Sequence, residues 1–163
     1  MDKRLNSDGS LIIGEHSFEF DLLKETKEFD QECVEFHPEK YLLVHLIQVS
    51  SQLKNENLEL FLAGVFHDIG KLNTKAPHKK IEGRYTYYGH EYMSVKLLKT
   101  LIFPELLKIF PDLNVEKISW LIANHMKIKQ NMRETKLDIL RKSEYYDDLK
   151  KLEKADTIWK EYP

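Results

Sequence analysis

A histidine and an aspartate stand side by side at the end of a strongly apolar stretch, which reads LFLAGVFHDIGKL from Leu60 to Leu72. Leu60 and Phe61 precede His67 and Asp68 by seven residues each, so a helical period places both polar side chains on the buried face. Burying an unpaired carboxylate costs several kcal/mol or forces it to take up a proton. A metal ion, or a complete set of hydrogen-bond partners, must therefore accompany this pair.

Four more polar side chains interrupt the apolar stripes of other expected helices, namely His45, His90, His125 and Asp156. A lone histidine on an apolar face is more often a hydrogen-bonded core residue than a ligand. Together with the His-Asp pair, however, five helices would need five separate sets of partners. Their stripes contain few neutral polar residues to provide them. One shared metal centre explains all five.

Four imidazoles and two carboxylates suit divalent transition metals, because neutral imidazole binds such ions and carboxylates can bridge two of them. Six ligands exceed the needs of one tetrahedral site. We therefore expect two ions, drawn from Mn, Fe, Ni and Co, with Mg or Zn as alternatives. Such pairs hydrolyse phosphate esters, with a metal-bound hydroxide as the nucleophile. The sequence has no GxxxxGK[ST] motif, which argues against ATP-driven transfer.

Cations follow the His-Asp pair. From Lys71 to Lys80 there are four lysines, one histidine and no acid, and Arg84 adds another cation. A solvated charge run and a phosphate-gripping loop both explain this composition. On the second interpretation, Asp68 and Lys71 are the catalytic residues. The residues expected to bind substrate are Lys71, Lys79, Lys80 and Arg84. Arg133 and Arg141 can also reach the site or lie in solvent, and Tyr85, Tyr87 and Tyr88 can stack on a base.

The bulk properties are those of one soluble domain. The chain has 163 residues, a formal net charge of -2 and a mean hydropathy of -0.50. This balance argues against a wholesale nucleic-acid or membrane-surface binder. No signal segment is recognisable at the N-terminus, and the apolar run from Tyr41 to Val49 is too short to span a bilayer. We expect a cytoplasmic protein with no membrane partner. The single cysteine, Cys33, excludes an intramolecular disulfide and is expected to be a buried thiol.

A helical bundle would bring the six polar residues together. The apolar periodicity predicts an all-α domain over residues 37–163, preceded by an extension over 1–36 with a short β-hairpin between Ser10 and Phe20. Gly70 is expected to end the central helix with a positive φ. Residues 73–88 are expected to form a loop. The other expected helices span about 38–53, 89–103, a short segment from Pro104, a segment capped by Asn114, part of 131–141, and 143–162.

The ordered set His45, HDIGK from His67 to Lys71, His90, His125 and Asp156 resembles the HD-domain metal-dependent phosphohydrolase superfamily over about residues 37 to 160. The resemblance implies an all-α bundle. It also implies that His45, His67, Asp68 and Asp156 are the core metal ligands. His90 and His125 correspond to the extra histidines of two-metal members, with Asp68 as the bridge. Lys71 matches a residue that contacts substrate phosphate in some members.

Two groups within the superfamily are similar in more detail. The segment YTYYGHEYMSVKLL looks like the GHE-containing segment of the HD domain in bacterial tRNA nucleotidyltransferases, which acts on 2′,3′-cyclic and 2′-phosphorylated nucleotides. The metal set is also similar to that of two-metal HD enzymes that hydrolyse diadenosine tetraphosphate. The implied function is a phosphodiesterase or phosphatase acting on a nucleotide or an RNA or DNA end. The alternatives are a non-catalytic nucleotide-binding HD module and a metal site that only stabilises the bundle.

Overall fold

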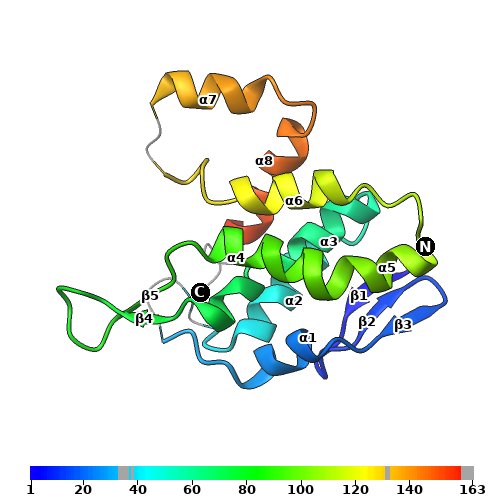
Figure 1. Cartoon of the computed structure of the whole chain (residues 1–163), viewed down its shortest axis with the longest axis horizontal. Coiled ribbons are helices and arrows are strands. Elements are labelled where there is room, and N and C mark those ends of the chain that lie inside the picture. Colours follow the sequence, from blue (N-terminus) through cyan, green and yellow to red (C-terminus); the bar gives the residue numbers. More distant parts are fainter. Residues whose placement is uncertain (33–36, 38, 131–132, 159–163) are drawn as a thin grey trace.

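Helices form most of the molecule, and a small antiparallel sheet closes one end of it (Figure 1). The computed structural model describes residues 1–32, 37, 39–130 and 133–158. The predicted all-α bundle with an N-terminal hairpin is confirmed. The α-helices of the described residues are α1 (Asp21–Glu25), α2 (Leu42–Gln52), α3 (Leu58–Phe66), α4 (His90–Leu97), α5 (Phe103–Ile109), α6 (Val115–Asn124), α7 (Glu134–Arg141) and α8 (Tyr146–Ile158). A π-helical turn, Leu98–Ile102, joins α4 to α5.

The N-terminal sheet has three strands, β1 (Lys3–Leu5), β2 (Leu11–Ile13) and β3 (His16–Phe18), paired in that order. The predicted hairpin corresponds to β2 and β3, and β1 is an additional strand that the sequence pattern did not reveal. Its side chain Leu5 is buried with Leu11 and Ile13 in the hydrophobic core of the bundle. The sheet and the helices therefore share one core.

Helix α3 occupies the centre of the fold. Every residue from Leu60 to Phe66 is buried, and the helix packs against α2, α6 and α8. A helix that is apolar on all sides must be surrounded by other elements, which explains this position. Asn57 caps its first turn by accepting a hydrogen bond of 2.9 Å from the Leu60 backbone N–H. The His-Asp pair directly follows this central helix.

The expectation that Gly70 ends the central helix with a positive φ is wrong. Gly70 does not adopt a positive φ, and the chain continues as a 3₁₀ turn over Ile69–Asn73. Glycine is needed here because α4 approaches closely: a Cβ atom on Gly70 would lie 2.1 Å from the His90 carbonyl oxygen. The Gly70 backbone N–H donates to Ser94 Oγ at 2.8 Å. This docking of α4 onto the turn holds His90 beside the His-Asp pair.

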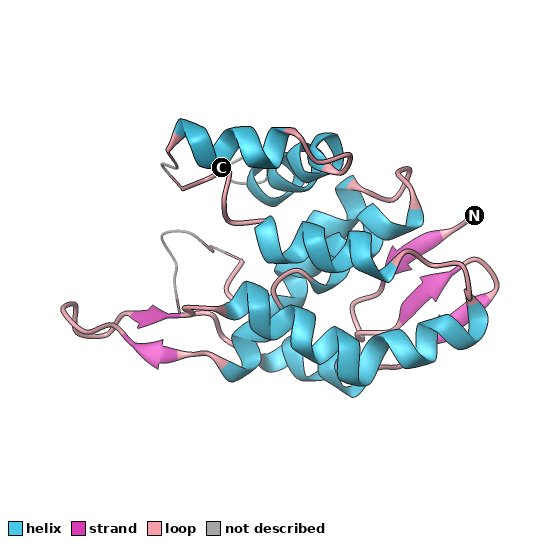
Figure 2. Cartoon of the chain, turned by 45° about the horizontal axis from the view of Figure 1, so that its top comes forward, coloured by secondary structure: helices cyan, strands magenta, loops and turns pink. Residues whose placement is uncertain are grey.

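Two elements lie at the periphery. Strands β4 (Ala76–Pro77) and β5 (Tyr85–Thr86) pair within the segment expected to be a loop, and their hairpin projects from the body (Figure 2). Helix α7 lies at the edge of the molecule and buries only Leu140. The expectations for Cys33 and for the end of the last helix beyond 158 fall outside the described residues. Within the described part of the chain, no helix has the length and apolar character needed to cross a membrane.

Candidate metal centre

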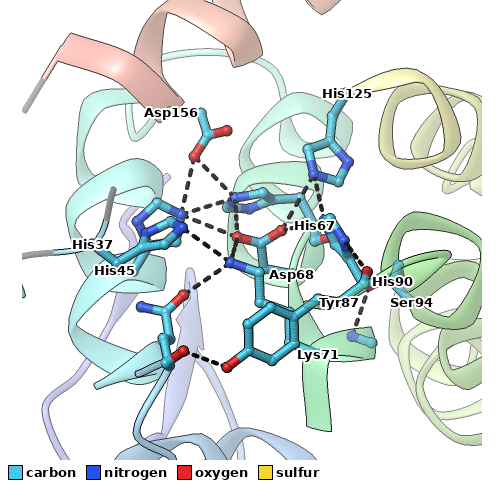
Figure 3. Close-up of polar contacts among 12 residues, drawn as sticks. His37, His45, His67, Asp68, Lys71, Tyr87, His90, Ser94, His125 and Asp156 are labelled. Carbon is cyan, nitrogen blue, oxygen red and sulfur yellow. Dashed lines mark hydrogen bonds and ion pairs between the residues drawn. The ribbon is translucent and has the colours of Figure 1, made fainter. Parts of the chain in front are cut away.

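Six buried side chains converge in the interior of the bundle (Figure 3). They come from α2, from the turn after α3, from the first residue of α4, from the C-terminal end of α6 and from α8. None of them is more than 6% exposed. They are the six predicted ligands His45, His67, Asp68, His90, His125 and Asp156. Segments that are far apart in the sequence thus meet at one point.

The first donor cluster consists of His45, His67, Asp68 and Asp156. His45 Nε2 lies 3.2 Å from Asp68 Oδ2 and 3.0 Å from Asp156 Oδ1. His67 Nε2 lies 3.2 Å and 3.3 Å from the same two oxygens. The two ring nitrogens are themselves 3.2 Å apart. Each of the two nitrogens therefore lies 3.0–3.3 Å from both carboxylate oxygens and from the other nitrogen.

The second donor cluster consists of Asp68, His90 and His125. Asp68 Oδ1 lies 3.0 Å from His90 Nε2 and 3.2 Å from His125 Nε2, and these nitrogens are 3.3 Å apart. Asp68 thus directs Oδ2 into the first donor cluster and Oδ1 into the second. This is the geometry of a bridging carboxylate.

The outer ring nitrogens determine which atoms face inward. The Nδ1 atoms of His67, His90 and His125 lie 2.8, 2.9 and 2.6 Å from the carbonyl oxygens of Gly64, Tyr87 and Ile122. A carbonyl oxygen only accepts, so each Nδ1 carries a proton and each ring directs its Nε2 atom toward the centre, where it could bind a metal ion. His45 differs, because its Nδ1 lies 3.1 Å from the carboxylate of Glu39. A backbone carbonyl oxygen or a carboxylate hydrogen-bonded to the outer ring nitrogen is typical of metal-bound histidines.

The donor chemistry and spacing fit metal ions. At a metal–ligand distance of about 2.1 Å, neighbouring ligand atoms are about 3.0 Å apart in octahedral and about 3.4 Å apart in tetrahedral geometry. The separations in both donor clusters, 3.0–3.3 Å, lie within these limits. Nitrogens that give up their protons to bind a metal repel carboxylate oxygens at these distances unless a cation lies between them. Each of the two donor clusters could hold a metal ion, and Asp68 belongs to both.

Charges in the centre perturb its titratable groups. Burial lowers the pKa of His45, but hydrogen bonds to Asp156, Asp68 and Glu39 outweigh it and raise the pKa to about 10. Burial raises the pKa of the Asp68 carboxyl, but the charges of His67 and Lys71 hold that pKa well below its usual range. Both carboxylates of the centre remain ionised at neutral pH, since the pKa of Asp156 is also lowered well below its usual range.

Lys71 is buried beside the first donor cluster, with only 4% of its surface exposed. Its Nζ atom lies 3.2 Å from Asp68 Oδ2 and donates to Gln31 Oε1 at 2.9 Å. It also lies 3.2 Å from Nε2 of His37, whose pKa is lowered to about 4 by burial and which is therefore neutral at pH 7. The ammonium also lies over the Tyr87 ring, 5.4 Å from the ring centroid. Together with Asp68, Gln31 and His37, this ring fixes the position of Nζ. The structure thus places the predicted catalytic lysine next to the predicted catalytic aspartate.

Several of these neighbours were not identified from the sequence. Glu39 accepts from His37 Nδ1 at 2.9 Å and also contacts His45, and these hydrogen bonds lower its pKa to about 2 against the opposing effect of burial. Lys129 forms an ion pair with Asp156 Oδ2. It lies in the turns that follow α6, where helical periodicity gives no signal. Gln31 lies in irregular backbone, where no periodicity could indicate it.

A cavity of about 570 Å³ opens over the metal centre. Asp68, Lys71, His90, Lys129 and Asp156 contribute to its wall, together with the three predicted stacking residues Tyr85, Tyr87 and Tyr88. Tyr88 is 78% exposed. A volume of this size is typical of sites for small organic ligands.

The other predicted cations lie elsewhere. Lys79 and Lys80 are exposed on the β4–β5 hairpin, and neither they nor Arg84 line this cavity. Arg133 lines a neighbouring cavity. Arg141 is paired with Glu134 and Asp138 on its own helix. A role in substrate binding for the hairpin cations therefore stays a prediction.

A family model described as the HD domain matches residues 41–158, which include all six residues of the two donor clusters. No curated protein matches the chain, and no solved structure does.

Proposed function

The chain belongs to the HD domain family, whose members are in general metal-dependent hydrolases, and we propose that it is a phosphohydrolase acting on a nucleotide or on a nucleic-acid end. The observation that carries the proposal is the position of Asp68. Its two oxygens face two different sets of histidines, and a nucleotide-sized cavity opens directly above them. Two ions held a few ångströms apart by one carboxylate are characteristic of enzymes that cleave phosphate esters.

The chain's own residues would bind and orient the substrate. Lys71 and Lys129 bring positive charge to the wall of a cavity that Asp68 and Asp156 would otherwise make negative. They favour a phosphate group there, and Tyr88 offers an exposed ring to a base. When bound, divalent ions would supply a water of lowered pKa as nucleophile and would neutralise charge on the phosphoryl oxygens.

Metal analysis and a substrate panel test this proposal. Purified protein would be loaded with Mn, Fe, Co, Ni, Zn or Mg, or treated with chelator. It would then be assayed on 2′,3′-cyclic nucleotides, nucleoside monophosphates, deoxynucleoside triphosphates, diadenosine tetraphosphate and an aryl phosphodiester. Asp68→Ala is the test variant, and Asp112→Ala, which removes an exposed carboxylate, is the matched control.

We expect metal-dependent hydrolysis of one substrate class, lost together with bound metal in Asp68→Ala and retained in Asp112→Ala. Activity that survives in Asp68→Ala would place the reaction elsewhere. Binding of nucleotides without turnover under any metal would instead indicate a nucleotide-binding module. Helices that melt when the metal is removed would indicate a stabilising site.

A further inference from the structure

A second and larger cavity, of about 920 Å³, lies beside the metal centre. Its walls come from α4, α6 and α7, and we call it the α6–α7 groove; the residues used below are Tyr92, Trp120, Lys127, Gln130, Arg133 and Lys136. Gln130 also lines the cavity over the metal centre, so the two cavities meet at this residue. A ligand bound at the metal centre can therefore extend along the groove.

The α6–α7 groove is positively charged although the whole chain is slightly acidic. Its lining residues include three cations, Lys127, Arg133 and Lys136, and no carboxylate. Within the described part of the chain, no ion pair involves Lys127, Arg133 or Lys136. The acids of α7 do not neutralise them, because Glu134 and Asp138 are both paired with Arg141. A surface with unpaired cations attracts a polyanion.

Aromatic rings accompany these cations. Tyr92 is 58% exposed on α4, and Trp120 on α6 is half-buried against Tyr145, with ring centroids 5.9 Å apart. Both rings line the groove that holds the cations. Rings on which bases stack, interleaved with cations that follow a phosphate backbone, are the recurring features of sites for single-stranded nucleic acid.

We propose that the α6–α7 groove binds a single-stranded nucleic-acid segment whose phosphorylated end lies at the metal centre. This inference rests on the proposed function and narrows its substrate to an oligonucleotide end. A mononucleotide would be accommodated by the first cavity and would leave three cations and two rings without a ligand. A paired duplex keeps its base faces stacked within the helix, so it cannot offer them to Tyr92 or Trp120.

Binding by fluorescence anisotropy tests the proposal apart from catalysis. The probe is a fluorescein-labelled oligoadenylate of about ten nucleotides, a length within the usual site sizes. The test variant is Arg133→Gln/Lys136→Gln, and the control is Lys27→Gln/Lys99→Gln, which neutralises two exposed lysines outside both cavities. Circular dichroism checks that both proteins are folded.

Neutralising the groove should weaken oligoadenylate binding about tenfold and reduce the dependence of log affinity on log salt by about 1.4, whereas the control should leave both unchanged. Tyr92→Ala should weaken binding about tenfold, and Tyr92→Phe should restore it. Equal affinity in the groove variant and the control would overturn the proposal, as would equal affinity of the wild type for single strand and hairpin duplex. Binding needs no turnover, so these results are separate from the hydrolysis assay. If mononucleotides are hydrolysed but oligonucleotide binding does not depend on the groove, the proposed role of the α6–α7 groove is refuted and the proposed phosphohydrolase activity is not.

Discussion

Lys71 and Lys79 belong to the same run of cations in the sequence, but the structure treats them in opposite ways. Lys71 is buried and held by Asp68, Gln31 and His37, whereas Lys79 is exposed on the projecting hairpin. A buried ammonium with fixed partners has a defined position and acts in a medium of low dielectric constant. An exposed lysine keeps its rotamer freedom and is screened by salt. The interior of this protein can therefore perform chemistry, and its periphery can attract and guide a ligand.

The difference extends to the surrounding elements. The two donor clusters are held by helices whose apolar faces fill the core, and their outer ring nitrogens are fixed by partners on the backbone or on Glu39. The β4–β5 hairpin and α7 have few buried side chains. Substitutions in the interior should therefore have large and specific effects, and those at the periphery should have small effects that depend on salt.

The largest effect on hydrolysis should come from substituting one ligand in each donor cluster in turn. Asp156→Asn takes a charge from the first donor cluster, and His90→Gln takes a ligand from the second. Each variant should lose one of two bound ions, and hydrolysis should fall about a thousandfold, since an ion contributes several kcal/mol to transition-state stabilisation. Metal analysis and kcat/KM measure this. Lys99→Gln, which neutralises an exposed lysine outside both cavities, serves as the control and should change hydrolysis little. Loss of both ions from either variant would show that the clusters are not independent.

Substituting one glycine in the interior and one in the hairpin compares how the two regions tolerate an added side chain, as measured by the free energy of unfolding. Gly70→Ala would place a methyl group 2.1 Å from the backbone oxygen of His90, so the turn or α4 must shift. We expect a loss of about 3 kcal/mol in the free energy of unfolding, measured in urea. Gly83→Ala meets open space, and only its φ of +78° opposes the side chain, which should cost about 1 kcal/mol. Similar losses for the two variants would contradict the close docking of α4.

The contrast between these regions also explains what the sequence could predict. His67 and Asp68 could be identified because the apolar period of the preceding helix predicts that they are buried. The same reasoning identified the other four donors. Gln31 comes from an irregular segment, where spacing carries no information about direction. Glu39 falls within the helix expected over 38–53, but α2 begins only at Leu42, so Glu39 lies in the turn before it. The purpose of Gly70 was mistaken for the same reason: glycine also permits close approach by another helix, and that contact is not local in sequence. The β4–β5 hairpin pairs only two residues per strand, too few for an alternating pattern to emerge.

A smaller effect should separate two glutamates that contact metal-centre histidines. Glu39 lies 3.1 Å from His45 Nδ1, whereas Glu91 lies 3.5 Å from His90 Nδ1, which already has the Tyr87 carbonyl oxygen at 2.9 Å. Glu39→Gln should weaken metal binding about tenfold, because it removes the charge that orients and polarises the imidazole. Glu91→Gln should change it less than about twofold. Chelator competition measures both affinities, and urea unfolding separates a loss of metal from a loss of fold. Equal effects would mean that Glu39 does not position His45.

The smallest effect is expected at the tip of the hairpin. Lys79 and Lys80 are predicted to contact substrate, yet they lie outside the cavity and are exposed, so their contribution can only be a screened attraction. Lys79→Gln/Lys80→Gln should raise KM about two- to threefold at low salt, leave kcat unchanged, and lose its effect at about 1 M salt, where the screening length is about 3 Å. Lys27→Gln/Lys99→Gln changes the net charge equally and controls for long-range steering. A lower kcat that persists at high salt would mean that the hairpin bends over the cavity and places its lysines on the substrate.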